Sequence, residues 1–127
     1  MIVLDSSALI EAAVGGEARP GLLREIIGTE LHVPHLLDYE YRNALRGMVL
    51  GAKISGKLAE AGLVFKKTMP IVRYTDEITG DRTWELRANF NPYDASYIAL
   101  AERLGCPLVT TDAKMERGAR TIEVRLY

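Results

Sequence analysis

The sequence of 127 residues lacks the features that mark several classes of protein. It holds a single cysteine, Cys106, so an internal disulfide is excluded. No apolar run is long enough to cross a membrane, and the first residues show neither a basic segment nor a small-residue cleavage site. Internal repeats, low-complexity segments and linkers are missing as well. We therefore expect a cytoplasmic protein, away from the membrane, in which residues 1–127 form a single domain with one core.

Two other shortages bear on chemistry. The formal net charge of -1 hides any local patch, so it speaks neither for nor against a nucleic-acid partner. The only histidines, His32 and His35, lie three residues apart across Pro34. Two imidazoles alone suit zinc poorly, which favours surface or packing roles for both. Cys106 precedes Pro107 and an apolar run, and we interpret it as a buried thiol rather than a nucleophile.

Short apolar runs alternate with helical patterns along the whole chain. Strands are predicted over residues 2–4, 31–33, 71–74, 107–110 and 121–124. Helices are predicted over residues 6–11 and on to Gly15, over 21–27, from Pro34 to about Leu50, over 55–67, over 76–90, from Asn91 to Gly105, and from Ala113. This order predicts an α/β fold with a central parallel sheet of about five strands and helices on both faces. Ligands of such sheets bind beyond the C-terminal ends of the strands.

Four acidic residues stand out against this pattern. Asp5 ends the first apolar run, and Asp112 follows the fourth, so both fall at C-terminal strand ends. Glu40 interrupts the apolar face of the long helix, and Asp94 lies in the first turn of the helix that begins after Asn91. Carboxylates are costly to gather unless a cation is gathered with them. If the four converge, they form a site for a hard metal ion such as Mg²⁺ or Mn²⁺.

Each acid also has an ordinary interpretation. Glu40 could lie at the edge of its apolar face and pair with Arg46. Asp94 could favour the positive end of its helix, and Asp5 could cap the helix that follows it. Asp112 could be a turn residue. The combination of all four positions favours a site more strongly than any single residue does.

The residues around these acids resemble the motifs of the PIN-domain ribonucleases, in particular the VapC-type toxins of toxin–antitoxin pairs. Residues 2–11, around Asp5, are similar to the first acidic motif of the family, and residues 37–45, around Glu40, resemble the second. Residues 93–101 match the third motif closely, and residues 108–112, with a threonine two positions before Asp112, resemble the fourth. The resemblance runs over nearly the whole chain in the order of the family.

The resemblance implies a PIN-like three-layer sandwich that cleaves RNA phosphodiesters with a divalent metal, Mg²⁺ or Mn²⁺, as cofactor. It gives catalytic roles to Asp5, Glu40, Asp94 and Asp112. Asp5, Asp94 and Asp112 would bind the metal, and Glu40 would be a further ligand or would orient the attacking water. Ser6 and Thr110 would support the acids by hydrogen bonds.

The resemblance also implies partners: an RNA substrate, a cognate VapB-like antitoxin that inhibits the enzyme, a second copy in a homodimer, and DNA only indirectly, through the antitoxin. Several cations lie near the acidic motifs in the sequence and could hold RNA phosphates or face solvent: Arg42, Arg46, Lys114, Arg117 and Arg120. Trp84 and Tyr93 could stack on bases, although we favour core or interface packing for both.

Two other functions remain open to the sequence. A catalytically silent binding module could keep the PIN fold, although the presence of all four acids argues against it. A phosphomonoesterase often uses a nucleophilic aspartate followed two residues later by a second aspartate. Here Ser7 follows Asp5 at that distance, which disfavours the phosphomonoesterase.

Overall fold

Five parallel strands form the centre of the molecule. The computed structural model describes residues 1–16 and 20–127. The strands are β1 (Ile2–Leu4), β2 (Leu31–Pro34), β3 (Ile71–Tyr74), β4 (Leu108–Thr110) and β5 (Val124–Leu126). Their order across the sheet is β3-β2-β1-β4-β5, and every neighbouring pair is parallel. The prediction of a five-stranded parallel sheet is confirmed, and the central strands β1 and β4 are buried along their whole length.

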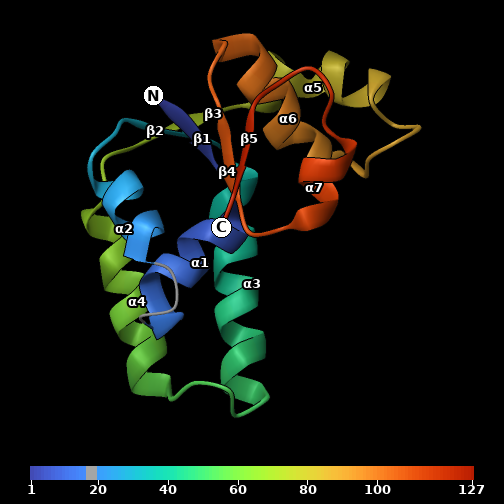
Figure 1. Cartoon of the computed structure of the whole chain (residues 1–127). Coiled ribbons are helices and arrows are strands. Elements are labelled where there is room, and N and C mark those ends of the chain that lie inside the picture. Colours follow the sequence, from blue (N-terminus) through green and yellow to red (C-terminus); the bar gives the residue numbers. More distant parts are fainter. Residues whose placement is uncertain (17–19) are drawn as a thin grey trace.

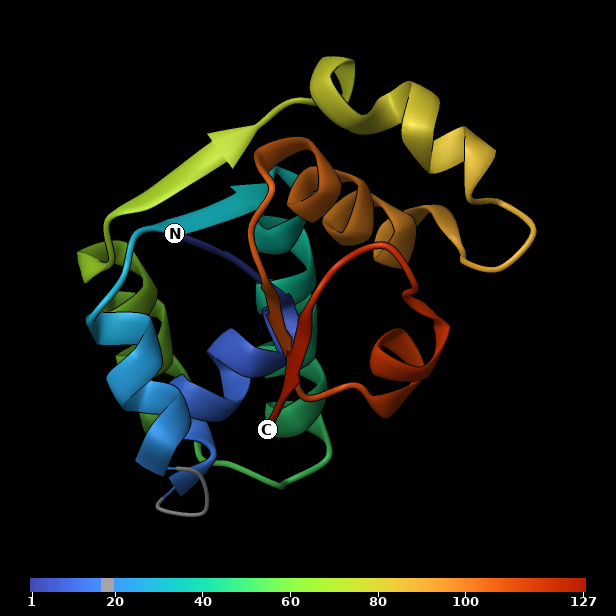
Figure 2. The same cartoon turned by 45° about the horizontal axis from the view of Figure 1, so that its top comes forward.

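Helices cover both faces of this sheet (Figures 1 and 2). The chain contains α1 (Ser6–Val14), α2 (Pro20–Ile27), α3 (Leu36–Leu50), α4 (Gly56–Thr68), α5 (Asp76–Glu85), α6 (Pro92–Leu104) and α7 (Ala113–Gly118). Helices α1 to α4 gather on one side, and α5 and α6 pack together on the other. This arrangement is a three-layer α/β sandwich, as the sequence predicts. None of the described helices is long and apolar enough to cross a membrane.

Local sequence signals set several helix ends as expected. The Asn91 side chain accepts a hydrogen bond from the Asp94 N–H at 2.9 Å, and Pro92 fills the first helical position of α6. Gly105 ends that helix with φ +63°, a left-handed conformation that favours glycine. The Ser55 hydroxyl accepts from the Leu58 N–H at 3.0 Å and begins α4.

Other boundaries differ from the sequence prediction. Pro34 is the last residue of β2, paired with Tyr74, so α3 begins only at Leu36. Helix α5 ends at Glu85 rather than at Phe90. The fifth strand is shifted from residues 121–124 to Val124–Leu126 because Leu108 and Thr110 of β4 pair with this later segment. Tertiary pairing overrides the local apolar pattern in that strand.

A partly buried ion network fixes the orientation of α3. Asp38 accepts hydrogen bonds from Lys66 at 2.6 Å and from Arg73 at 2.6 Å, which joins α3, α4 and β3. Arg73 is the main reason that the pKa of Asp38 lies well below its usual range. On a neighbouring face of α3, the Tyr41 hydroxyl donates to the Gly62 carbonyl at 2.6 Å. With Asp38 and Tyr41 held in this way, Glu40 faces away from α4 and toward α6.

Candidate active site

Asp5 lies at the end of the central strand β1 and is held by hydroxyl groups. Its side chain is in the interior, and the residue is only 6% exposed. The Ser7 hydroxyl donates to one carboxyl oxygen at 2.6 Å, and the Thr110 hydroxyl donates to the same oxygen at 2.7 Å. Ser6 makes a longer contact with the other oxygen, at 3.5 Å. Asp5 occupies the N-cap position of α1, but its side chain makes no capping hydrogen bond and is used by the hydroxyl groups instead.

Thr110 also ties the end of β4 to the end of β1. Its hydroxyl oxygen accepts the Asp112 N–H at 3.0 Å while its proton goes to Asp5. The Ser7 hydroxyl oxygen accepts the Thr111 N–H at 3.1 Å. These bonds fix the turn that carries Asp112 relative to Asp5. The Asp112 side chain itself accepts the Lys114 N–H at 2.8 Å, so it also serves as the N-cap of α7.

Glu40 reaches the same region from α3. Its carboxyl accepts a hydrogen bond from the buried Tyr97 hydroxyl at 2.7 Å, and Tyr97 lies three residues after Asp94 on α6. Glu40 therefore has a hydroxyl partner from the opposite layer instead of the ion pair with Arg46 that the ordinary interpretation requires.

The acids act on one another through their charges. Desolvation is the largest cause that raises the pKa of Asp94, and the charges of Asp5 and Asp112 raise it further. Desolvation is likewise the first cause that raises the pKa of Glu40, and Asp5 and Asp94 add to it. The pKa of Tyr97 is raised by burial and then by the charges of Glu40 and Asp5. Four acids from β1, α3, α6 and the end of β4 thus face a common region.

The donor set fits a hydrated divalent cation. None of the four acids forms an ion pair in the part of the chain that the structure describes. Within residues 1–16 and 20–127, no three acidic, histidine or cysteine side chains stand close enough together to hold one ion at once. Mg²⁺ is commonly bound by one or two carboxylates directly and keeps several waters. Oxygen donors that share a region without closing on one point suit that type of binding.

The comparisons with known proteins agree with this geometry. A family model described as PIN domain matches residues 2–120. The chain belongs to the PIN domain family. Ribonuclease VapC9 of Mycobacterium tuberculosis is 39% identical over 116 residues, which cover 91% of this chain and 88% of that protein.

Solved structures of low sequence identity share the PIN fold. The crystal structure of Mycobacterium tuberculosis VapC20, a sarcin-ricin loop cleaving toxin, aligns with a TM-score of 0.68 at 18% identity and covers 98% of this chain and 99% of that chain. VapBC2 from Rickettsia felis, bound to a DNA fragment from its promoter, aligns with a TM-score of 0.70 at 14% identity and covers 100% and 99%. At these identities the alignments show the fold alone.

The cations suggested by the sequence occupy two different places on the PIN domain. Lys114 lies close enough to Asp94 for its charge to lower the pKa of that acid. Arg42 and Arg46 line an apolar groove of about 420 Å³ between α3 and α4. The Arg42 guanidinium lies 5.5 Å from the centre of the Tyr39 ring. Arg117 and Arg120 are exposed.

Several side interpretations from the sequence can now be checked. Trp84 is 68% exposed and Tyr93 is 56% exposed, so packing of either residue in the core is wrong. His32 is buried and its Nδ1 lies 2.7 Å from the Tyr74 hydroxyl, whereas His35 is exposed, so the two histidines play different roles. Cys106 is half-buried, and burial raises the pKa of its thiol.

Two residues of the site were missed as functional candidates. Ser7 connects Asp5 with the turn after β4, and Tyr97 holds Glu40. The spacing of three residues between Asp94 and Tyr97 on one helix was a usable signal, because such residues share a face. The link from Ser7 to the turn after β4 carries no comparable signal, since Thr110 and Thr111 lie more than 100 residues away.

Glu40→Gln should stabilise the metal-free PIN domain near neutral pH. Because the pKa of Glu40 is raised above 4.5, the folded state holds its proton more tightly than the unfolded state. The stability due to this group is therefore present at low pH and lost as the pH rises through the folded-state pKa. Glutamine avoids that loss and keeps an acceptor for Tyr97. We expect a gain of at most about 1 kcal/mol, since Glu40 is only partly buried.

Denaturant melts of both proteins in a chelator, from acid to neutral pH, would measure the effect. The difference should vanish below about pH 4, where the wild-type carboxyl is protonated in both states. Glu60→Gln, at an exposed position of α4, is the matched control and should change stability by less than about 0.5 kcal/mol. A pH-independent difference between Glu40→Gln and the wild type would contradict the electrostatic origin.

Proposed function

We propose that this protein is a divalent-metal-dependent endoribonuclease toxin, one PIN-like nuclease domain over residues 1–127, which a cognate VapB-like antitoxin inhibits. The observation that carries the proposal is the buried Asp5, placed among three further acids without an ion-pair partner among the described residues. The 39% identity to a curated VapC ribonuclease over 91% of the chain supports RNA as the substrate.

In the proposed mechanism, Asp5, Asp94 and Asp112 would hold Mg²⁺ or Mn²⁺. When bound, the ion supplies a Lewis acid for a phosphoryl oxygen and a water of lowered pKa. Thr110 and Ser7 keep the Asp5 carboxyl in one orientation, with Ser6 beside it. Glu40, fixed by Tyr97, is placed to orient the attacking water and to accept its proton. Thus all four acids are catalytic in this proposal.

RNA would approach the acids past Lys114, whose charge acts on Asp94. Arg42 and Arg46 can add phosphate contacts farther along α3, because both are exposed. The alternative function is a catalytically silent PIN-fold binding module. It predicts RNA binding without cleavage, so a single assay separates the two.

Asp5→Asn and Asp94→Asn should each abolish RNA cleavage while the protein stays folded. Each change removes one metal-binding charge, and losses of at least about 100-fold in rate are expected when a ligand of a catalytic ion is lost. Cleavage of labelled RNA with Mg²⁺ or Mn²⁺ gives the rates, and thermal melts report folding. Asp81→Asn, an exposed acid of α5, is the control and should cleave normally. Full activity of either site variant would contradict the mechanism, and an inactive wild type would favour the silent module.

We also propose a homodimer. Helix α4 leaves Leu58 39% exposed and Val64 60% exposed, an apolar face that a second copy can cover. Light scattering at tens of micromolar, roughly the range in which a standard interface holds, should give twice the chain mass. Val64→Glu should shift the mass toward the monomer, while Val72→Glu, at an exposed position of β3, should not. A monomer for the wild type would rule the dimer out.

We propose that the antitoxin blocks the acids with a basic residue on a flexible segment. The apolar floor of the α3–α4 groove and the two arginines at its side fit an antitoxin segment that is apolar and acidic. Beyond it, four acids without a paired cation attract an arginine, whose planar guanidinium matches carboxylates. Such an arginine would exclude the metal.

Titration of the cognate antitoxin and of its Arg→Ala variants against RNA cleavage tests this model. One arginine variant should inhibit at least about tenfold less well, the effect of roughly 1.4 kcal/mol. Excess Mg²⁺ or Mn²⁺ should weaken inhibition by the wild-type antitoxin, because the metal and the arginine compete for the same acids. If no arginine matters and the metal has no effect, the antitoxin acts by covering the RNA path instead.

A further inference from the structure

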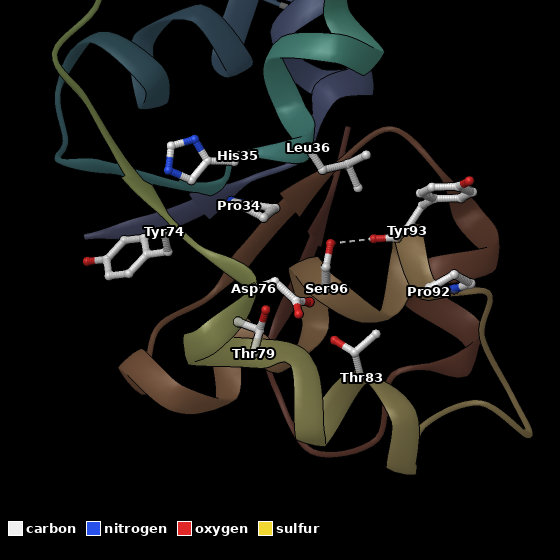
Figure 3. Close-up of a pocket in the computed structure, with 10 residues that line it drawn as sticks. All are labelled: Pro34, His35, Leu36, Tyr74, Asp76, Thr79, Thr83, Pro92, Tyr93 and Ser96. Carbon is white, nitrogen blue, oxygen red and sulfur yellow. Dashed lines mark hydrogen bonds between the residues drawn. The ribbon is translucent and has the colours of Figure 1, made fainter.

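Besides the groove between α3 and α4, the structure contains a cavity near the acids, and its lining is less acidic than the site itself. It lies among the starts of α3, α5 and α6 and encloses about 250 Å³ (Figure 3). This is somewhat below the range of roughly 300–1,000 Å³ usual for pockets of drug-sized ligands. We infer that this cavity, the base pocket, holds one nucleobase of the RNA and selects guanine through Asp76. The inference rests on the proposed ribonuclease function and adds the basis of its sequence preference.

Residues of the base pocket and two of the acids come from the same helices, α3 and α6. Leu36 lines the pocket and lies one helical turn before Glu40 on the same face of α3. Tyr93 and Ser96 line it as well, on either side of Asp94 in the first turns of α6. The Ser96 hydroxyl donates to the Tyr93 carbonyl at 2.7 Å, which steadies this wall. A nucleotide with its base in the pocket would therefore have its phosphate close to the acids.

The lining of the pocket suits a base better than a phosphate. Among the described residues that line it there is no lysine or arginine. Proline, leucine and tyrosine side chains form much of the wall, and such surfaces accept a planar heterocycle. The Tyr74 hydroxyl is engaged by His32, so the polar groups left to a ligand are the exposed His35 imidazole and, on the α5 side, three side chains that carry oxygen. Figure 3 shows the Asp76 carboxyl grouped there with the hydroxyls of Thr79 and Thr83.

Two of these groups have unused hydrogen-bonding capacity. The Thr83 Oγ1 atom is buried and has no hydrogen-bond partner among the described residues. Such atoms are rare in folded proteins, and a ligand is one common reason for them. Asp76 is exposed, and it forms no side-chain hydrogen bond or ion pair in the described part of the chain. Its carboxyl is positioned over Gly80, where an added Cβ would meet it at 2.8 Å, so the glycine leaves room for this orientation.

A carboxylate distinguishes guanine from the other bases. It offers two oxygens that only accept hydrogen bonds. Guanine presents two adjacent donors, the N1–H and the N2 amino group, to both oxygens at once. Adenine and cytosine present one amino group beside an acceptor nitrogen, and the N3–H of uracil lies between two carbonyl oxygens. Asp76 therefore favours guanine, while Thr83 can donate its proton to an acceptor of the base.

Sequencing of cleavage products from a random RNA pool would test the inference without knowledge of the natural target. Wild-type ends should be enriched in guanine at one fixed position near the cut. Loss of a bidentate base contact costs about 1–3 kcal/mol, so inosine, which lacks the N2 amino group, should lower kcat/KM about 5- to 150-fold at that position. Asp76→Asn should abolish the preference mainly through KM. Asp81→Asn removes one negative charge from the same helix outside the pocket, and this variant should keep the guanine preference.

A binding measurement separates failure of this inference from failure of the ribonuclease function. Guanosine monophosphate should shift the amide NMR signals of Thr79 and Thr83 in the metal-free protein, inosine monophosphate should do so less, and Asp76→Asn should lose the difference. If the wild type cleaves no RNA but these shifts appear, the ribonuclease proposal fails and the base pocket stands. Cleavage without an Asp76-dependent guanine preference overturns the base pocket. A changed oligomeric mass for Asp76→Asn also overturns it, because the cavity would then receive a second copy.

Discussion

The placement of Asp5 in the interior is the constraint on which the rest of the structure depends. A carboxyl group that is 6% exposed at the end of the central strand needs compensation. Here the compensation comes from hydroxyl groups of Ser7 and Thr110, and no basic side chain among the described residues pairs with Asp5. Because hydroxyl groups do not neutralise the Asp5 carboxylate, its negative charge helps to raise the pKa of the neighbouring Asp94 and Glu40. A cation bound beside Asp5 would offset the free-energy cost of burying this carboxylate.

Several basic residues are paired with acids outside this region, whereas the charge of Lys114 reaches Asp94. Lys66 and Arg73 are taken up by Asp38, Arg82 is held by Glu102, and Arg125 is held by Glu25 and Glu123. These pairs fix helices and strands to one another away from the acids. The near-zero net charge of the chain therefore does not reflect an even distribution of charge. The ion pairs stabilise the packing of helices and strands, while Asp5 and its acidic neighbours form no ion pairs among the described residues. In the proposed mechanism, this separation lets a domain of ordinary composition attract a metal ion.

The same short segments build both the acidic region and the base pocket. The step from β2 into α3 supplies Leu36 to the pocket and, one turn later, Glu40 to the acids. The start of α6 supplies Tyr93 to the pocket and Asp94 to the acids. If both proposals hold, the starts of α3 and α6 couple cleavage to base selection. A substitution that moves either helix by a fraction of an ångström is expected to alter cleavage and sequence preference together.

The sequence by itself determined the fold class, the strand number, the N-cap at Asn91 and the identity of the four acids as a set. These follow from local periodicity, from cap chemistry and from the rule that parallel strands bring their ends together. Only the tertiary structure decided that Ser7 holds Asp5 and that Tyr97 holds Glu40. It also decided that Trp84 is exposed and that β5 begins at Val124. The same is true of the cavity that Asp76 and Thr83 line. The reason is that these features depend on how the layers pack. The hydrogen bond from Thr110 to Asp5, for example, joins residues 105 positions apart, and the shape of a cavity depends on several elements at once. No local sequence pattern records that packing.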